Sequence, residues 1–396
     1  MRIGIDGACL ANRRGFGRFA RRIVAAIGEV GAGSGHEFLA FVDRPSIGVA
    51  PVPEAVETVA VEVRHAPSRA ASASGRRSVG DMVAMGRAMS RARLDLVYFP
   101  ASYSFVPVWG VGRVVVTLHD TMALAHPGLI FPGGKGRLAW KMKEHAAVAW
   151  ADRVVTVSEA ARRDLIAWFR LPEGRVRVVG EGPDPVFSPR RGDEGIEILR
   201  RYGVDPDRRY WLYVGGLSPH KNLLRLIEAF AGLDESDRLV LVGDLGDVFH
   251  THVPELRAAV DRLGLGERVR FTGFVPDDDL TYIYTRAYAL AQPSLMEGFG
   301  LPPVEAMACG TPVASSTAGS LPEVVGEAGV FFDPTDVGAI RSTLRALGDD
   351  PARRDVLAAA ALERSRRFTW EGAARTLLDL FEELGPTRLR KARAGA

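Results

Sequence analysis

The segment that most constrains what this chain can fold into reads Glu297-Gly-Phe-Gly-Leu-Pro-Pro-Val-Glu305. Its two glycines and two prolines disfavour a single continuous helix. The pattern instead predicts a loop that enters a helix with Pro303 in the first turn, which leaves Glu297 on the loop and Glu305 within that turn. Backbone N–H groups are then available to face an anion at the helix N-terminus. They belong to Phe299, Gly300 and Leu301.

Two carboxylates beside a phosphate-binding backbone suit a sugar nucleotide, which carries hydroxyl groups and a diphosphate. A lone Glu305 in a first helical turn has a simpler explanation, because a carboxylate there complements the helix dipole. The glycine- and proline-rich spacer and the downstream Glu323 favour the ligand-binding interpretation.

Composition narrows the class of protein. A chain of 396 residues with 47% hydrophobic and 25% charged residues is an ordinary globular protein of two or three domains. A net charge of +3 gives no case for nucleic-acid binding. The two cysteines, Cys9 and Cys309, are far apart and suggest neither a disulfide framework nor a metal site. No signal peptide or apolar run of about 18 residues is evident, so we expect a cytoplasmic protein. Peripheral contact with the inner face of the membrane is left open.

Short β-branched runs alternate with amphipathic stretches, a pattern typical of βαβ units on parallel sheets. The first helix is predicted over Gly17–Ile27, and the predicted strands include Arg2–Asp6, Leu96–Phe99, Tyr210–Val214 and Arg238–Val242. The fold class is therefore α/β, with two doubly wound, Rossmann-like domains and an interdomain cleft. A stretch rich in glycine and proline, Gly180–Asp193, is interpreted as the linker. The predicted domains are an N-terminal Rossmann-like domain, 1–185, a C-terminal Rossmann-like domain, 194–368, and a last helical segment, 369–396, that ends in a basic tail.

In such sheets, ligands bind beyond the carboxyl ends of the strands. The segment Gly15-Phe-Gly-Arg-Phe-Ala20 lies between the first strand and the first helix, where glycines let the backbone approach a phosphate. It formally matches the dinucleotide pattern G-x-G-x-x-A. NAD binding is disfavoured because eight residues separate Gly15 from the strand end at Asp6, and because Asp43 lies beyond the offset expected for the acidic partner. An ordinary pair of turn glycines is the other interpretation.

Three further segments follow predicted strands. His119 and Asp120 come after the apolar strand Arg113–Leu118, where they either point toward a ligand or cap a loop. Lys221 follows the glycine pair that ends at Gly216 and is placed to meet phosphate oxygens, although a surface lysine is the simpler reading. The loop Gly273-Phe274-Val275 has room for a nucleobase. Next to it, Asp277-Asp-Asp279 is interpreted as helix-capping and dipole-complementing rather than metal-binding.

Together these segments resemble the retaining glycosyltransferases of family four, a mannosyltransferase-like group with the GT-B architecture. The most specific part is Glu297–Glu305, which matches the Glu-x7-Glu motif of that family. The resemblance extends over nearly the whole chain. Its other parts are Ala306–Ala314, Gly319–Glu323, Val157–Glu159 and the Gly-Phe-Gly-Arg-Phe segment.

The resemblance implies that domain 1–185 binds the acceptor, that domain 194–368 binds the nucleotide sugar, and that the helix of 369–396 packs back toward the first domain. It also implies a role for each site residue. Glu297 would hold donor-sugar hydroxyls, Glu305 the ribose hydroxyls and Lys221 the diphosphate. His119 would contact the donor sugar, so Glu297, His119 and Lys221 form the expected catalytic set. The remaining donor contacts fall on glycine loops, on the base-binding loop and on backbone groups: Gly15, Gly17, Gly216, Gly273, Phe274, Val275, Phe299, Gly300 and Leu301.

One departure from the family concerns Gly216, where many members carry an arginine. Charge compensation would then rest on Lys221 and helix N-termini, or on a first-domain arginine: Arg13, Arg14 or Arg18. The expected reaction moves a sugar from a nucleoside diphosphate to a hydroxyl with retained configuration, with no metal ion or other cofactor. GDP-mannose is weakly favoured over UDP- and dTDP-sugars.

The expected partners are a nucleotide-sugar donor and a hydroxyl acceptor, which is a glycan, a lipid-linked glycan or a small molecule. Loops of the first domain would select this acceptor. Alternatives remain open: a sugar-nucleotide epimerase or hydrolase of the same architecture, an NAD-dependent dehydrogenase, and a non-catalytic sugar-binding subunit. The acceptor loops are Ala11–Gly17, Ser102–Trp109, Met122–Pro127 and Phe131–Arg137.

Overall fold

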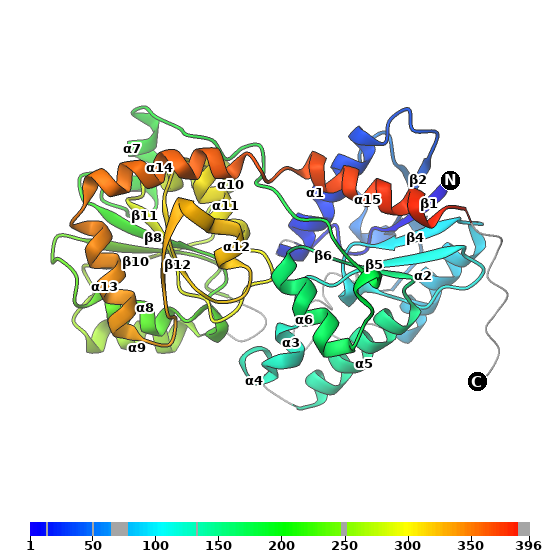
Figure 1. Ribbon diagram of the computed structural model, residues 1–396, viewed down its shortest axis with the longest axis horizontal. Helices are drawn as coiled ribbons and strands as arrows, with labels where there is room; N and C mark the ends of the chain where they lie inside the picture. The colour runs from blue at the N-terminus through cyan, green and yellow to red at the C-terminus, as the bar shows by residue number, and fades with distance from the viewer. Residues whose placement is uncertain (13–14, 50, 65–77, 132–133, 247–251, 387–396) are drawn as a thin grey trace. The chain divides into compact units, whose positions relative to one another are not determined.

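Two parallel sheets organise the chain (Figure 1). The computed structural model describes residues 1–12, 15–49, 51–64, 78–131, 134–246 and 252–386. It divides into an N-terminal unit, Met1–Ala125, Gly133–Glu181 and Trp370–Ala396, and a C-terminal unit, His126–Pro132 and Gly182–Thr369. The two doubly wound, Rossmann-like sheets expected from the alternating pattern are confirmed.

The N-terminal sheet has seven parallel strands in the order β3-β2-β1-β4-β5-β6-β7. From β1 the strand order runs through β2 and β3 to one edge of the sheet, and from β4 through β7 to the other edge. The topological switch point of this sheet therefore lies between β1 and β4. The strands are β1 Arg2–Asp6, β2 Glu37–Asp43, β3 Glu57–Val61, β4 Leu96–Phe99, β5 Arg113–Thr117, β6 Arg153–Thr156 and β7 Val176–Val178.

Helices cover both faces of this sheet. Apolar side chains of α2, α5 and α6 join those of the strands in one core cluster, and α1 packs beside α15 on the other face (Figure 1). The helices are α1 Gly15–Val30, α2 Val79–Arg91, α3 Met122–Ala125, α5 Gly134–Trp150, α6 Glu159–Phe169 and α15 Trp370–Leu384, with 3-10 turns η1 Arg44–Ser46, η3 Ser102–Ser104 and η4 Glu173–Arg175.

Helix α15 is the last element of the chain, yet it belongs to the N-terminal unit. Its apolar face is buried there: the Phe381 ring packs 5.6 Å from Tyr98 of the sheet, and the Trp370 ring packs 5.7 Å from Phe19 of α1. Glu383 of α15 also forms an ion pair with Arg177 of β7 at 2.6 Å. The helix therefore completes one face of the first sheet.

The C-terminal sheet has six parallel strands in the order β10-β9-β8-β11-β12-β13. Its switch point lies between β8 and β11, with helices on both faces (Figure 1). The strands are β8 Tyr210–Val214, β9 Arg238–Val242, β10 Val269–Gly273, β11 Ala289–Gln292, β12 Val313–Ser316 and β13 Gly329–Phe332. The helices of this unit are α4 Pro127–Ile130, α7 Glu194–Arg201, α8 Leu223–Phe230, α9 Val253–Arg262, α10 Asp277–Arg286, α11 Leu301–Ala308, α12 Leu321–Val325, α13 Val337–Gly348 and α14 Pro351–Ser365, with 3-10 turns η5 Pro219–Lys221 and η6 Gly326–Ala328.

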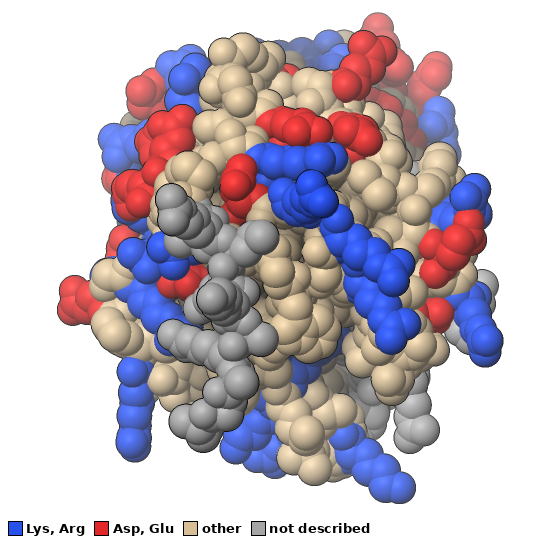
Figure 2. Space-filling model, turned by 90° about the vertical axis from the view of Figure 1, so that its right-hand side faces the viewer, with Lys and Arg blue, Asp and Glu red and all other residues tan. Residues whose placement is uncertain are grey.

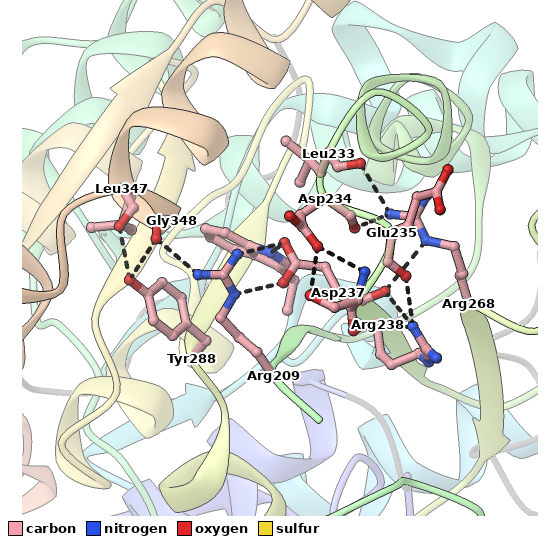
Figure 3. A network of polar contacts seen from close by, with 12 residues as sticks. Arg209, Leu233, Asp234, Glu235, Asp237, Arg238, Arg268, Tyr288, Leu347 and Gly348 are labelled. Carbon is pink, nitrogen blue, oxygen red and sulfur yellow. Dashed lines mark hydrogen bonds and ion pairs between the residues drawn. The ribbon is translucent and has the colours of Figure 1, made fainter. Parts of the chain in front are cut away.

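A polar network closes the amino ends of three neighbouring strands of this sheet (Figure 3). Arg209 precedes β8, Asp237 precedes β9 and Tyr288 precedes β11. The Arg209 guanidinium donates to both oxygens of the buried Asp237 carboxylate, at 2.5 and 3.1 Å, and to the Gly348 carbonyl at 2.8 Å. Trp211 Nε1 donates to the same carboxylate at 3.2 Å. We call these five residues the amino-end network.

Three local expectations are corrected. Helix α1 begins at Gly15 rather than Gly17, so the glycine segment lies in its first turn. Helix α11 begins at Leu301, which moves Glu305 out of the first turn. Asp277 is the first residue of α10, and Pro276 occupies the capping position.

The surface carries both signs of charge. On the face shown in Figure 2, Lys and Arg side chains lie among Asp and Glu side chains, in keeping with the small net charge. Within the described ranges, no helix is both long and apolar enough to cross a bilayer.

Candidate active site

The loop after β11 carries Glu297 at the carboxyl end of the C-terminal sheet. Three donors converge on its Oε1 atom: Lys221 Nζ at 2.7 Å, Ser294 Oγ at 2.7 Å and Gln292 Nε2 at 2.9 Å. We call these four residues the carboxyl-end cluster. No hydrogen bond joins Oε2 to any described residue, so one oxygen is fixed and the other is available to a ligand.

The backbone of this loop is anchored by serines from the next strand and helix. Ser316 Oγ donates to the Ser294 carbonyl at 2.7 Å. Ser320 Oγ donates to the carbonyls of Phe299, at 2.7 Å, and of Glu297, at 3.1 Å. These contacts hold the carboxylate in place without occupying its second oxygen.

Gly319 makes this anchoring possible. Its φ is +60°, and a Cβ atom built on it would lie 2.5 Å from the Glu297 carbonyl oxygen and 2.9 Å from the Glu297 nitrogen. Such distances are too short for a side chain, and the backbone conformation itself disfavours any residue with a Cβ. The Gly-Ser-Leu-Pro-Glu segment therefore contributes to the site by letting its backbone approach that of Glu297.

Lys221 ends the turn η5 that follows β8. The next residue, Asn222, donates to the carbonyls of Pro293 and Pro334, at 3.0 and 2.7 Å. The Leu295 N–H donates to the His220 carbonyl at 2.9 Å. The lysine turn and the glutamate loop are thus bonded to each other, which sets the position of Lys221 relative to Glu297.

Electrostatics keep the Glu297 carboxyl group ionised. Burial acts to raise the pKa of Glu297, but the Lys221 charge and the hydrogen bonds from Lys221 and Ser294 outweigh it, and the pKa is lowered. Burial, with the neighbouring Lys221 charge, lowers the pKa of His220 to about 3. At neutral pH the site therefore contains a carboxylate, an ammonium group and an uncharged imidazole.

Glu305 lies deeper than Glu297, on α11, and is only 2% exposed. The Tyr284 hydroxyl donates to its Oε2 atom at 3.0 Å. The three N–H groups predicted to face a ligand, those of Phe299, Gly300 and Leu301, stand at the start of the same helix, and none of them donates to another described residue. Helix α11 thus presents a positive end next to the Glu297 loop.

Other predicted donor contacts lie at the carboxyl ends of β8 and β10. Gly216 follows β8, and its carbonyl accepts a hydrogen bond from the Tyr213 hydroxyl at 2.6 Å. After Gly273, the Phe274 side chain is 69% exposed, while Val275 is buried in the core. An exposed aromatic ring at this position is available for stacking against a nucleobase.

His119 belongs to the N-terminal unit and follows β5. Its ring lies edge-on to Phe16 and Phe19 of α1, with centroids 4.9 and 4.7 Å apart. Burial lowers the pKa of His119 to about 3, and its Nε2 atom has no partner among the described residues. The side chain is therefore an uncharged imidazole with one unsatisfied ring nitrogen.

The glycines of α1 differ in what surrounds them. A Cβ atom on Gly17 would lie 1.8 Å from the Asn12 carbonyl oxygen, so this glycine is required for backbone packing. A Cβ atom on Gly15 would meet no atom of the described residues within 4 Å. The two glycines therefore differ, since packing requires a glycine at position 17 and the described part of the chain does not require one at position 15.

Three arginines of the first domain are the candidates for the cation that would replace an arginine at position 216. Arg13 and Arg14 lie outside the described residues, and Arg18 lies in α1. Across the described ranges, no three His, Cys, Asp or Glu side chains gather as a group able to hold a metal ion.

Sequence reasoning missed the supports of the site. Gln292 and Ser294 bind Glu297, Ser320 anchors its backbone, and Asn222 joins the two loops. Gln292 could have been identified from the sequence, because it is a polar residue at the end of an apolar strand.

Comparisons with known proteins identify the family of the chain. The family described as Glycosyltransferase Family 4 matches residues 16–187, and that described as glycosyl transferases group 1 matches residues 196–364. Over 284 residues the chain is 34% identical to the O-antigen chain mannosyltransferase B of Escherichia coli, a match that covers 69% of this chain and 71% of that protein.

A second relative is the D-inositol 3-phosphate glycosyltransferase of Salinispora tropica, 35% identical over 291 residues. That match covers 69% of this chain and 60% of the relative. Among solved structures, the sucrose-phosphate synthase of Thermosynechococcus elongatus superposes with a TM-score of 0.76 at 22% identity, over 97% of this chain and 99% of that one.

Fold and sequence together define the class, a glycosyltransferase built from two Rossmann-like units in the GT-B architecture. Within that class, the chain belongs to glycosyltransferase family 4.

Proposed function

We propose that this protein transfers a sugar, with retained anomeric configuration, from a nucleoside-diphosphate sugar to an acceptor hydroxyl. GDP-mannose is the donor we favour weakly, because the chain resembles the mannosyltransferase-like group and one relative is named a mannosyltransferase. UDP- and dTDP-sugars are the other candidates. The acceptor is a glycan, a lipid-linked glycan or a small molecule.

The observation that carries this proposal is the arrangement around Glu297. Lys221, Ser294 and Gln292 all bind Oε1, which leaves Oε2 for a sugar hydroxyl. The same contacts hold the Lys221 ammonium group against Glu297, whose loop leads into α11 at Leu301, and this supports the proposal that the two positive groups meet a diphosphate.

In the proposed reaction, negative charge develops on the leaving diphosphate and positive charge on the sugar ring. Lys221 and the N–H groups at the start of α11 stabilise the first, and Glu297 favours the second. The acceptor oxygen attacks from the face that the diphosphate leaves, and the leaving phosphate takes the acceptor proton. Lys221 and backbone groups supply this charge stabilisation without a metal ion.

Glu305 is proposed to bind the ribose hydroxyls, and the loop Gly273-Phe274-Val275 to hold the base. His119 is proposed to contact the donor sugar as an uncharged imidazole. Gly15 and Gly216 are proposed to lie against the diphosphate, and Gly17 to hold their loop in place. If the acceptor is a lipid-linked glycan, the protein would work as a peripheral membrane protein of the cytoplasm.

A thermal-shift panel with UDP, GDP, dTDP, ADP and NAD, each without metal, tests the donor. A ligand at a hundred times its dissociation constant adds about 2.7 kcal/mol to the free energy of unfolding. A shift with one nucleoside diphosphate names the base. A shift with NAD alone contradicts the transferase proposal.

The two alternative functions make different predictions for the products. An epimerase or hydrolase converts the nucleotide sugar in the absence of any acceptor. A non-catalytic binding subunit shows a thermal shift and no turnover with any acceptor. Glycoside that forms only when donor and acceptor are both present supports the transferase.

A further inference from the structure

A polar group that the proposed donor chemistry does not use lies at the carboxyl edge of the N-terminal sheet. Glu144, on α5, is 4% exposed. The Ser102 hydroxyl donates to its Oε1 atom at 2.7 Å. Its Oε2 atom is shielded from solvent and has no hydrogen-bond partner among the described residues. A buried carboxyl oxygen without a donor is unfavourable, so a ligand that supplies one binds favourably there.

The place of this group in the fold is that of a ligand site. Ser102 follows β4 and Asp120 follows β5, on the side of the switch point where β4 pairs with β1. Tyr103, from the same turn as Ser102, receives a hydrogen bond from Asn12 of the loop after β1 at 3.2 Å. Residues from three strand ends therefore meet at the crevice where doubly wound sheets bind ligands.

The charges at this edge indicate what kind of ligand fits. Burial raises the pKa of Glu144 and the hydrogen bond from Ser102 lowers it, while the Asp120 charge raises it and the Lys143 charge lowers it, so charges of both signs act on this carboxyl group. The Lys143 ammonium group also donates to the Tyr103 carbonyl, and Arg21 donates to the carbonyls of Leu10, at 2.7 Å, and Asn12, at 2.6 Å. Carboxyl groups repel a phosphate and accept hydrogen bonds from hydroxyl groups.

We propose that the edge formed by Ser102, Asp120 and Glu144 binds a neutral sugar unit of the acceptor, with a sugar hydroxyl donating to Glu144 Oε2. This inference rests on the proposed transferase function and adds the substrate class of its acceptor. It assigns this chain an acceptor without a phosphate group at the subsite, unlike the acceptor named for its inositol-phosphate relative.

The test compares two acceptors with the full-length protein and the donor identified by thermal shift. Methyl α-mannoside or a mannobiose is the neutral probe, and D-inositol 3-phosphate is the phosphorylated one. We expect glycoside formation with the neutral probe and a kcat/KM at least tenfold lower with the phosphorylated probe. Preference for the phosphorylated probe overturns the inference and leaves the transferase function standing, whereas failure of every nucleotide to bind removes the proposed function itself.

Variants then assign the effect to Glu144. Glu144→Ala is expected to raise the acceptor KM about tenfold, the loss of one buried hydrogen bond, while the donor KM and the nucleotide thermal shift stay unchanged. Glu144→Gln, which keeps a carbonyl oxygen and an N–H group in the same space, should recover most of this loss. Glu173→Gln is the matched control, because the Glu173 side chain is 84% exposed.

Ser102→Ala provides a second route if Glu144→Ala does not fold. It removes the donor to Oε1 and frees the carboxyl group to rotate, so we expect a roughly threefold rise in acceptor KM. An unchanged acceptor KM in the variants that fold, or equal changes in the donor and acceptor KM, would mean that Glu144 is a structural residue and would sink the proposal.

Discussion

The two ends of the C-terminal sheet carry polar groups of opposite character. At the amino ends, Asp237 receives three hydrogen bonds that use both of its oxygens, and Arg209 is shared between that carboxylate and a backbone carbonyl (Figure 3). At the carboxyl ends, Glu297 receives three hydrogen bonds on one oxygen and none from described residues on the other. Both ends are held by strand β11, which Tyr288 precedes and Gln292 ends.

This difference suggests that the amino ends of these strands serve the stability of the fold and that their carboxyl ends serve ligand binding. A buried carboxylate with hydrogen bonds on both oxygens is satisfied without a ligand, so we expect the amino-end network to contribute to folding rather than to binding. A carboxylate with one fixed and one open oxygen is oriented and still able to bind. Substitutions at the two ends should therefore change different measured quantities.

The largest effect is expected from Lys221→Ala. In the proposed reaction, the developing charge on the diphosphate then loses its side-chain cation, so kcat should fall about 100- to 1000-fold while the protein stays folded. Steady-state kinetics, with circular dichroism as the folding check, measure this. Lys141→Ala, at an exposed position, is the matched control. Near-normal turnover of Lys221→Ala would show that the cation lies elsewhere.

Asp237→Asn should break the amino-end network instead. It leaves the charge of Arg209 without its counter-ion and weakens the contact with Trp211, so the free energy of unfolding should fall by about 2–4 kcal/mol. Thermal and urea denaturation measure this loss, and kcat per folded molecule should stay unchanged. Asp355→Asn, at a side chain that is 76% exposed, is the control. A loss of kcat without a loss of stability would reverse the assignment of the two ends.

Gly319→Ala tests the backbone contact that supports Glu297. The variant places a Cβ atom against the Glu297 backbone, so kcat should fall about tenfold and stability by roughly 1–2 kcal/mol. Gly264→Ala is matched to it, because Gly264 has a φ of +66° and open space around its Cβ position. The control shares the backbone strain and lacks the contact. Equal kcat values in the two variants would show that the contact between Gly319 and the Glu297 backbone does not affect turnover.

The smallest effect concerns pH. His220 titrates at about 3 in the folded protein and near 6.5 when unfolded, so the unfolded chain binds the extra proton as pH falls. Between pH 7 and 5.5 this costs about 1 kcal/mol of stability, or a few degrees in Tm.

The His220→Gln variant should lose less Tm than the wild type over that interval. His119 has the same sign of shift, so part of the slope should remain. At the amino-end network, Asp237→Asn should leave this slope as it is in the wild type. An unchanged slope in His220→Gln would exclude His220 as its source.

Much of the fold was predictable because parallel strands buried on both faces read as continuous apolar runs. The bounds of β1, β4, β8 and β9 match the predicted ranges. Helix α1 was predicted two residues short because glycine has a low helix propensity, and the structure uses Gly17 for close packing against Asn12. Helix α7 was missed, although Ile198 and Leu199 are buried on it, because the preceding linker drew the interpretation toward loop.

The candidate site was less accessible from sequence. Motif spacing singled out Glu297 and Lys221, which are 76 positions apart, but not their direct contact. That contact depends on Asn222 and on the serines that fix the two loops, and such residues have no distinctive pattern. The low pKa of His119 likewise depends on burial beside the rings of Phe16 and Phe19, which periodicity cannot reveal.

The position of α15 has a consequence for how the protein is made. The residues that cover one face of the N-terminal sheet, including Leu377 and Phe381, are translated after the whole C-terminal unit. The second unit therefore has all its strands and can fold on the ribosome while the first still exposes an apolar face to solvent. The N-terminal unit is therefore the first to be synthesised and the last to be completed. Its uncovered sheet face is where a chaperone would bind during synthesis.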